Sequence, residues 1–365
     1  MRCHANEALN KYLPLAHLKC TDFRCLESFE IDLDSKVNLI YGKNAAGKTS
    51  VLEAIGYLGR GRSFRGAGNK ELIRHGAEEF VLVGSVEREN TTTPLGVRNG
   101  KKGLEVRAGG EKCYSASALA EILPLQIIDP DVHELVAGGP EGRRRFIDWI
   151  AFHVEHGYAS IWKKFRRVLK QRNAAIKEGK SPDALKTWDR EFIGVSEQVD
   201  LIRRNIVDII NSSLEELADL LLEQPIELQY LPGWQGNKSL EEALAAATER
   251  DLLLGSTQVG PHRGDVDVLF KSRKARKLVS RGQQKLVSCS LVIAATEMVQ
   301  THLERPVLLL VDDPAAELDI YSVARLMVCI EHIGCQVIAT ALDSEPQIFS
   351  SPPKMFHVEH GSLVP

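Results

Sequence analysis

A glycine-rich loop carries the clearest chemistry in the chain. It consists of Gly42, Lys43, Asn44, Ala45, Ala46, Gly47, Lys48 and Thr49, and it fits the pattern G-x-x-x-x-G-K-[ST] in full. Gly42 and Gly47 allow the backbone to wrap around phosphates, so that successive N–H groups point at phosphate oxygens. Lys48 is placed to reach the β- and γ-phosphates, and Thr49 offers a hydroxyl to Mg²⁺. The loop therefore predicts a binding site for ATP and Mg²⁺.

Two adjacent carboxylates form the second chemical signal. Asp312 and Asp313 follow the aliphatic residues 308–311, a run typical of a buried strand. A hard oxygen ligand at the end of such a strand suits Mg²⁺, so Asp312 is predicted to hold the metal together with Thr49. Asp313 is then placed to orient or deprotonate the attacking water, which predicts an ATPase.

A third segment completes the set. Ser280, Arg281, Gly282 and Gln283 resemble the ABC signature L-S-G-G-Q, with Arg281 in place of the first glycine. In ABC proteins this segment of one subunit covers the γ-phosphate bound by another. A hydroxyl, a glycine and the positive end of a helix that starts near Gln283 suit that task. The alternative is that Ser280 only caps the helix.

Two further residues fit the same ABC pattern. Asp319 closes the segment 316–319, which resembles the D-loop that crosses the dimer interface beside the nucleotides. Gln126 lies where a Q-loop glutamine would stand and is predicted to be catalytic. Taken alone, residues 316–319 would be an ordinary start of a helix.

The elements that must position these residues follow from apolar periodicity. Strands are predicted at residues 29–33, 37–41, 80–86, 104–106, 307–311 and 336–340, and helices at residues 48–58 and 283–299. Buried apolar strands that alternate with helices predict a mostly parallel sheet covered on both faces. The glycine-rich loop lies between a predicted strand and a predicted helix, as phosphate binding requires.

The middle of the chain has almost no strand signal. Apolar residues mark one helix near residues 158–169, and residues 179–183 (GKSPD) break it. Trp188, Phe192, Val195, Val199, Ile202, Ile206 and Ile209 then recur at heptad spacing. An antiparallel helical hairpin is predicted, either as a subdomain with an ordinary core or as a projecting arm that contacts a partner.

The fold class is therefore α/β, a P-loop ABC-type ATPase head with an inserted helical hairpin. The predicted parts are residues 14–138 (head, N-terminal part), 139–250 (helical arm) and 251–365 (head, C-terminal part). Residues 1–13 precede the predicted fold, as a tail or a misassigned start. The long interval between Lys48 and Asp312 agrees with a head that is split by an insertion.

Composition limits the class of protein. The chain has 365 residues, 44% of them hydrophobic and 26% charged, with no stretch of 18 apolar residues and no signal-peptide core. We expect a cytoplasmic protein without a membrane span. The seven cysteines form no C-x-x-C pair and predict free thiols rather than a zinc site.

Basic clusters offer sites for nucleic acid. With a net charge of −3, any DNA site must be a local patch. Candidates are Arg60, Arg62 and Arg65; Arg143, Arg144 and Arg145; and Lys271, Arg273, Lys274, Arg276 and Lys277. The alternative for each cluster is a solvated face or a hairpin turn, and the Arg60 cluster is the favoured DNA site.

Together these motifs resemble the RecF family. The resemblance rests on residues 22–24 (DFR), 42–53 (GKNAAGKTSVLE), 59–65 (GRGRSFR), 126–130 (QIIDP), 138–149 (GGPEGRRRFIDW), 169–175 (LKQRNAA), 259–265 (VGPHRGD), 280–286 (SRGQQKL) and 310–319 (LVDDPAAELD). Two positions depart from ABC proteins generally. Asp313 replaces a glutamate, which would fit slow hydrolysis, and Thr340 stands where many ABC proteins have a switch histidine.

The resemblance implies a role in recombinational repair and replication restart. RecF-like proteins form an ATP-dependent homodimer on single-strand/double-strand DNA junctions, with little sequence specificity. They act with RecR, RecO and RecA, and help to load RecA onto gapped DNA, while slow hydrolysis resets the clamp. Two alternatives remain: an ABC-type subunit with a non-DNA partner such as a transporter, and a switch that binds ATP without significant hydrolysis.

Overall fold

The computed structural model describes residues 12–89, 91–344 and 349–364. The chain divides into two compact units, Met1–Val132 with Cys289–Pro365, and His133–Ser288. Of the predicted tail, residues 1–11 lie outside the described residues, and strand β1 (Tyr12–Phe23) begins at Tyr12. The six described cysteines are free thiols, as expected.

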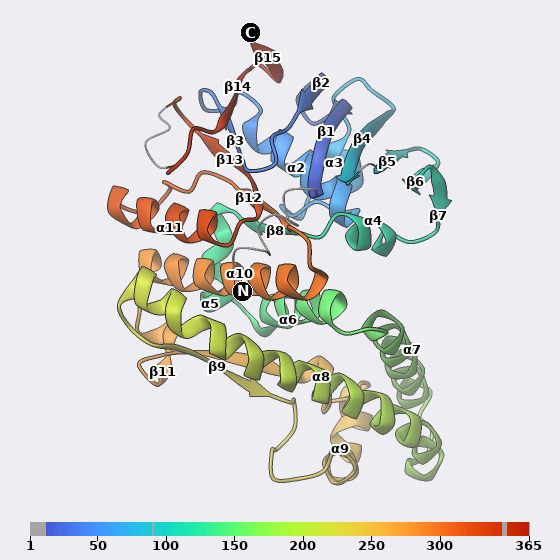
Figure 1. The fold of residues 1–365 in the computed structure, drawn as a ribbon. Coiled ribbons are helices and arrows are strands. Elements are labelled where there is room, and N and C mark those ends of the chain that lie inside the picture. Colours follow the sequence, from blue (N-terminus) through green and yellow to red (C-terminus); the bar gives the residue numbers. More distant parts are fainter. Residues whose placement is uncertain (1–11, 90, 345–348, 365) are drawn as a thin grey trace. The chain divides into compact units, whose positions relative to one another are not determined.

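The first unit contains the predicted, mostly parallel sheet. Its strand order is β15 (Ser362–Val364), β14 (Lys354–Glu359), β3 (Val37–Tyr41), β13 (Gln336–Ala341), β12 (Leu308–Val311) and β8 (Leu125–Ile128) (Figure 1). Only β15 runs antiparallel to its neighbour. Every residue of β12 and β8 is buried, which explains their continuous apolar sequences. The parallel arrangement brings the carboxyl ends of β3, β12 and β13 to one edge.

A second sheet in this unit is antiparallel. Its order is β2 (Leu26–Asp32), β1, β4 (Glu79–Arg88), β5 (Thr91–Gly100), β6 (Gly103–Ala108) and β7 (Glu111–Cys113). Phe29 and Ile31 are buried, whereas Glu30 and Asp32 are exposed, so the predicted half-buried alternation is confirmed. The sequence analysis did not predict this second sheet, because strand periodicity does not identify which strands pair.

Helix α2 (Lys48–Arg60) lies between the two sheets. It contacts β8 and β13 of the parallel sheet and β1, β4 and β5 of the antiparallel sheet. Residues 51–59 are all buried, so this helix has no solvent-facing side over more than two turns. One apolar cluster joins both sheets to α2. The helix that follows the glycine-rich loop is therefore held from two sides. Short helices α3 (Asn69–Leu72) and α4 (Ser117–Ile122) and helix α11 (Ile320–His332) complete this unit.

Helix α10 (Arg281–Leu303) contains the boundary between the units at residues 288 and 289. Among the described residues it is the one helix long and apolar enough to cross a membrane, and 72% of its most apolar window is buried inside the structure. Such burial is typical of a core helix, and the sequence-based prediction of a buried helix at residues 283–299 is confirmed.

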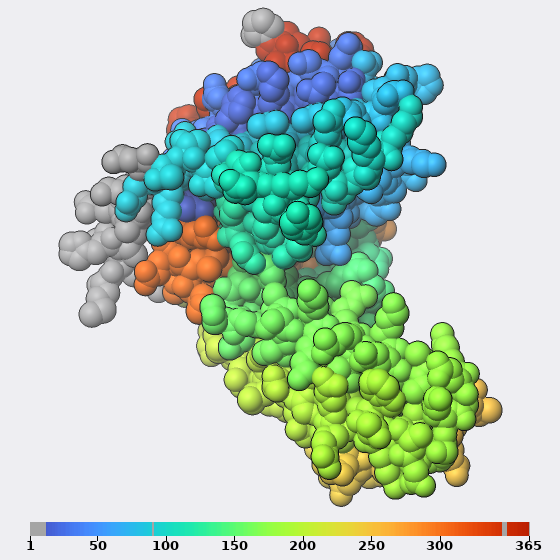
Figure 2. Space-filling view, turned by 90° about the vertical axis from the view of Figure 1, so that its right-hand side faces the viewer, coloured from blue at the N-terminus to red at the C-terminus, as the bar shows by residue number. Residues whose placement is uncertain are grey.

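The second unit begins with α5 (Glu134–Ala137) and contains α6 (Pro140–Val154), α7 (Tyr158–Lys177), α8 (Pro182–Leu222) and α9 (Leu240–Leu254). Helices α7 and α8 contact each other and form the predicted hairpin. Figure 2 shows part of this unit's surface, where the green to yellow-green residues of α7 and α8 form much of the visible face.

The heptad pattern fails toward the end of α8. Phe192, Val195, Val199 and Ile206 are buried as predicted, but Ile209 is 52% exposed and Ile210 is fully buried. A straight helix has 3.6 residues per turn, so a strict seven-residue repeat drifts around its surface. The buried face of α8 therefore moves by one position relative to the heptad, and it includes Ser196 and Arg203.

A small antiparallel sheet changes the second predicted boundary. Strand β9 (Ile226–Leu231) pairs with β10 (Asp265–Phe270), which pairs with β11 (Arg273–Lys274). These pairs join residues on both sides of the predicted boundary at 250/251. The second unit therefore extends to Ser288 and contains the signature-like segment that we had assigned to the head.

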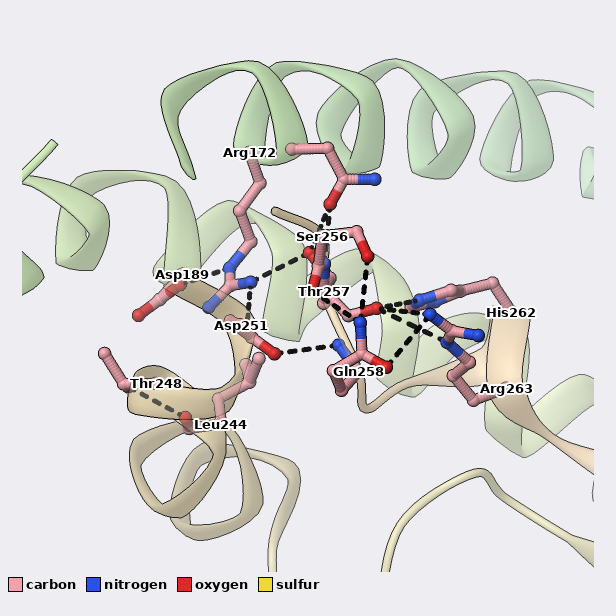
Figure 3. Close-up of polar contacts among 11 residues, drawn as sticks. Arg172, Asp189, Leu244, Thr248, Asp251, Ser256, Thr257, Gln258, His262 and Arg263 are labelled. Atoms are coloured by element: carbon pink, nitrogen blue, oxygen red, sulfur yellow. Dashed lines mark hydrogen bonds and ion pairs between the residues drawn. The ribbon is translucent and has the colours of Figure 1, made fainter. Parts of the chain in front are cut away.

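A buried polar network joins α7 and α8 near the turn of the hairpin (Figure 3). The Arg172 guanidinium on α7 donates hydrogen bonds to Asp189 at 2.7 Å, Asp251 at 2.6 Å and Thr257 at 2.8 Å. The other oxygen of Asp251 accepts a bond from the Gln258 N–H at 2.8 Å. Arg172 and Asp251 are both fully buried, so each charge depends on the other for compensation.

Candidate nucleotide site

The glycine-rich loop connects β3 to α2 and lines a pocket of about 290 Å³. The lining residues are Cys25, Asn44, Ala45, Ala46, Gly47, Lys48, Thr49, Ser50, Arg65, Asp312, Asp313, Thr340 and Leu342. Gly42 (φ 154°) and Gly47 (φ 111°) have backbone conformations that side chains rarely adopt, and a Cβ on Gly42 would lie 2.2 Å from the Val358 carbonyl oxygen. The backbone conformation at Gly42 and Gly47 therefore explains why the loop has glycine at both positions.

The Lys48 side chain folds back over the glycine-rich loop. Its ammonium donates hydrogen bonds to the carbonyl oxygens of Gly42 at 2.5 Å and Lys43 at 3.0 Å. Burial lowers the pKa of Lys48, while the charges of Asp313 and Asp312 act in the opposite direction. A cation held at this place can neutralise phosphate charge.

Asp312 and Thr49 meet as predicted. The Thr49 hydroxyl donates to Asp312 Oδ1 at 3.2 Å, and the carboxylate is 6% exposed at the end of β12. Burial raises the pKa of Asp312, and hydrogen bonds from Thr340 and Thr49 oppose that shift. A hydroxyl and a carboxylate are hard oxygen donors, so this pair fits Mg²⁺. Within the described part of the chain no group of three or more His, Cys, Asp or Glu could hold a metal, so phosphates and water would have to supply the other ligands.

Asp313 occupies the place predicted for the water-orienting carboxylate. It lines the pocket and has φ 47°, a left-handed conformation that is uncommon for a residue other than glycine. Its N–H donates to the Thr340 hydroxyl at 2.9 Å. The unusual backbone at Asp313 is thus stabilised by a side chain from the neighbouring strand.

Gln126 forms a hydrogen bond within the fold. Its amide oxygen accepts a hydrogen bond from the Arg60 guanidinium at 3.2 Å, and the side chain does not line the pocket. Strand β8 continues two residues further, and Asp129 follows its end. The pKa of Asp129 is raised to about 6 by burial and by the charges of Asp131 and Asp312. Gln126 is a hydrogen-bond partner of Arg60, and its catalytic role stays a prediction.

The arginines of the first basic cluster divide among different roles. Arg60 points inward, donating also to the Leu125 carbonyl at 3.1 Å, and burial lowers its pKa to about 10. Arg65 lines the nucleotide pocket, and its guanidinium lies 3.9 Å from the buried Glu53. Arg62 is exposed. Arg60 is therefore unsuited to contact DNA, because its guanidinium is directed into the fold.

A similar correction applies to the second basic cluster. Arg143 is 4% exposed and forms two hydrogen bonds to Asp265, at 2.8 and 3.0 Å. Arg144 donates to the Gly264 carbonyl at 2.8 Å, and Arg145 pairs with Glu141 on the same helix. The third cluster, hereafter the basic segment (Lys271, Arg273, Lys274, Arg276 and Lys277), is exposed throughout.

The signature-like residues lie at the start of α10. The Ser280 hydroxyl accepts from the Gln283 N–H at 3.4 Å, and the Gln283 side chain accepts from the Ser280 N–H at 3.1 Å. This reciprocal pair is a capping box, so the capping role of Ser280 is present. Ser280, Arg281 and Gln283 are exposed and Gly282 is half-buried. The cap leaves the first turn of the helix accessible to an anion.

Asp319 is the N-cap residue of α11. Its carboxylate accepts from the N–H groups of Tyr321 at 3.0 Å and Ser322 at 2.9 Å, and from the Ser322 hydroxyl at 2.7 Å. These hydrogen bonds lower the pKa of Asp319. In the second unit, the His262 ring lies within hydrogen-bond distance, 2.9 Å, of the Thr257 carbonyl oxygen.

Two residues that line the pocket or support the loop had no signal in the sequence. Cys25 comes from the turn between β1 and β2, and its thiol lies 3.4 Å from the Ser50 hydroxyl. Gly361, in the turn between β14 and β15, donates its N–H to the Ala46 carbonyl at 2.8 Å. These turns support the loop from parts of the chain remote in sequence. The contacts of the two turns with the loop become visible only in the folded structure.

Comparison with known proteins agrees with this geometry. The family model described as RecF/RecN/SMC N terminal domain matches residues 14–361. The DNA replication and repair protein RecF of Shewanella oneidensis is 36% identical over 356 residues, which cover 96% of this chain and 99% of that protein. The RecF protein of Pseudomonas paraeruginosa is 37% identical over 361 residues, covering 96% of this chain and 97% of that protein.

Solved structures support the same fold. The recombination mediator protein RecF-ATPrS in the RecFOR pathway superposes with a TM-score of 0.86 at 25% identity, covering 98% of both chains. An Smc head domain of Pyrococcus furiosus gives a TM-score of 0.61 at 16% identity, covering 96% of this chain and 95% of that chain, a likeness of fold alone. The α/β ABC-type head predicted from the motifs is therefore confirmed, and the chain belongs to the RecF family of DNA replication and repair proteins.

Proposed function

We propose that this chain binds ATP with Mg²⁺ in the pocket of the glycine-rich loop and hydrolyses it slowly. The observation that carries the proposal is the meeting of Lys48, Thr49 and Asp312 around one pocket, although Asp312 is far from the loop in sequence. The loop N–H groups and Lys48 would hold the phosphates. Thr49 and Asp312 would hold Mg²⁺, which supplies charge neutralisation at the phosphate oxygens.

Asp313 would orient the attacking water or accept its proton. It lines the pocket beside Asp312, and its carboxylate is one methylene shorter than the glutamate of ABC proteins generally. Because its side chain is shorter, Asp313 would reach the water less well, which fits slow turnover that serves a conformational switch. Asp313→Asn should therefore retain ATP binding and lose hydrolysis. A natural chain and an Asp313→Asn variant with equal turnover would favour a switch that does not depend on hydrolysis.

The exposed first turn of α10 supports a homodimer that forms on ATP. Ser280, Gly282 and Gln283 would cover the γ-phosphate bound by a second copy, and Asp319 would lie at the same interface. Ser280→Arg should bind ATP and fail to dimerise. Lys48→Met should fail at both steps. ATP-driven dimerisation of the Ser280 variant equal to that of the natural chain would exclude this role for the signature-like segment.

The proposed target is DNA at single-strand/double-strand junctions, in recombinational repair and replication restart in the cytoplasm. RecR, RecO and RecA are the proposed partners, with the loading of RecA onto gapped DNA as the outcome. Family membership supports this proposal, and the basic segment, with Arg62, offers cations for binding phosphates. Binding to phosphates carries no sequence information, so it should depend on DNA structure.

The test is sedimentation of the protein on gapped duplex DNA with ATP, with ADP and without nucleotide. ATP alone should yield a DNA-bound dimer. A double charge reversal at Arg276 and Lys277 should weaken binding and reduce the slope of log K against log salt by about 0.9 for each phosphate that the variant no longer neutralises. Lys180→Glu, an exposed lysine between α7 and α8, is the control. Binding that ignores ATP and salt would contradict the proposal.

A further inference from the structure

Thr340 joins both carboxylates of the acidic strand. It lies near the end of β13, is fully buried, and lines the nucleotide pocket. Its hydroxyl donates to Asp312 Oδ1 at 2.7 Å and accepts the Asp313 N–H at 2.9 Å. The parallel register pairs Val311 with Ala339, so the next residue of each strand meets the other just beyond the pairing.

The direction of these hydrogen bonds is fixed. A backbone N–H can only donate, so the bond from Asp313 occupies a lone pair of the Thr340 oxygen. The one hydroxyl proton is then free for Asp312 Oδ1, which also accepts the proton of Thr49. The result is a continuous chain from the Asp313 backbone through Thr340 and Asp312 to the hydroxyl on the glycine-rich loop.

Both groups that Thr340 contacts need support. The Asp313 backbone has φ 47°, and such a conformation in a residue other than glycine persists only when its surroundings hold it. Asp312 is a buried carboxylate whose orientation decides where its second oxygen points. Thr340 is β-branched and therefore stiff at χ1, which suits a side chain that must hold two groups at fixed positions.

We propose that Thr340 is a positioning residue for ATP hydrolysis. It orients the Asp312 carboxylate toward the metal and holds Asp313 toward the attacking water. The inference rests on the proposed ATPase function and goes beyond it, because it assigns to the end of β13 a role that does not require the histidine found there in many ABC proteins.

The expected effect separates turnover from binding. Removing a group that orients a metal ligand typically costs about 10- to 100-fold in metal affinity or activity. Thr340→Val keeps the shape and loses the hydroxyl, so kcat should fall by about that factor and the Mg²⁺ concentration needed for half-maximal turnover should rise. The KM for ATP should change little, because the loop that binds the phosphates is untouched.

Two further variants make the test specific. Thr340→Ser restores the hydroxyl and should recover most of the turnover. Thr296→Val removes another fully buried hydroxyl, which donates to the Val292 carbonyl at 2.7 Å within α10, and should leave kcat and Mg²⁺ dependence unchanged. Thermal unfolding of all three variants reports any general loss of stability.

The experiment measures Mg²⁺-dependent ATP turnover of the natural chain and the three variants, together with ATP binding. Natural rates in Thr340→Val, or equal losses in Thr340→Val, Thr340→Ser and Thr296→Val, would overturn the inference. Failure of the proposed function would be seen in the natural chain itself, as an absence of Mg²⁺-dependent turnover. Failure of the positioning role would be seen only in the variants.

Discussion

Replacing Arg172 by methionine tests how the second unit is held together. The Arg172 side chain is fully buried and bridges α7 to Asp189 on α8, Asp251 on α9 and Thr257 (Figure 3). Methionine has a similar length and fills much of the same space. The substitution leaves Asp251, which is also fully buried, with the Gln258 N–H bond to its other oxygen and no opposing guanidinium.

Removing one partner of a buried ion pair typically costs about 3–5 kcal/mol, because the other charge stays buried without compensation. One nitrogen of Arg172, Nη2, has no hydrogen-bond partner among the described residues, which places the expected loss toward the lower part of that range. For a unit the size of His133–Ser288, this loss corresponds to a fall in Tm of roughly 6–20 °C.

The assay is denaturant unfolding of the full chain, followed by far-UV circular dichroism and by ATP binding. The helical signal of the second unit should be lost at lower denaturant concentration, while ATP affinity in dilute buffer should stay unchanged because every pocket residue belongs to the first unit. Arg145→Met, which breaks an exposed pair with Glu141, is the control and should change little.

A double substitution separates charge from packing. Arg172→Met with Asp251→Asn removes the uncompensated charge, so it should be more stable than Arg172→Met alone. A loss below about 1 kcal/mol in the single variant would refute the reasoning, since it would mean that Asp251 is stable without its partner. An additive loss in the double variant would refute it equally.

Three other perturbations address the site and the turn at His262. ATP should slow alkylation of Cys25, which lines the pocket, but not of Cys113, and equal rates with and without ATP would contradict the geometry. Gly361→Ala would place a Cβ 2.4 Å from the Cys25 carbonyl oxygen at φ 76°, a strain of about 1–3 kcal/mol that should weaken ATP binding in titrations; Gly103→Ala, at φ 86° with open space, should not. Burial lowers the pKa of His262 from 6.5 to about 4, so the stability that its neutral ring provides is complete above pH 6.5 and is lost as the pH falls toward 4. His262→Gln should flatten the dependence of the unfolding midpoint on pH in that window, and an unchanged slope would argue against a buried neutral ring.

The sequence predicted the chemistry of the first unit well, because that chemistry is local in sequence. Residues 42–49 carry their own glycines, lysine and threonine, and β12 ends in its own carboxylates. The meeting of Thr49 with Asp312 was predictable, because a buried strand that ends in acids usually lies beside the phosphate loop in this class of fold.

The partners of individual polar and charged residues could not be predicted from the sequence. Arg60 donates a hydrogen bond to Gln126, and Arg143 donates one to Asp265. Both arginines nevertheless belong to basic runs that are typical of a solvated surface. The sequence shows which residues are charged, but it does not show which residues they pair with in the fold. Thr340 shows the converse, since a single threonine at the end of an apolar strand gains its meaning only when β13 pairs with β12.

Strand pairing keeps the nucleotide site assembled although a large insertion interrupts the first unit. Most pocket residues lie in the glycine-rich loop after β3 and at or just beyond the ends of β12 and β13, strands that are adjacent in the sheet. The turn at Cys25 also lines the pocket, and the turn at Gly361 supports the loop. The segment between β8 and β12 joins neighbouring parallel strands whose register is set by their own hydrogen bonds, Leu308 with Leu125 to Val311 with Ile128. The entropy of closing a connection grows only slowly with its length, so the connection can hold an entire unit at small cost to the pairing. Strand register, and not chain length, therefore places Asp312 and Thr340 beside the loop.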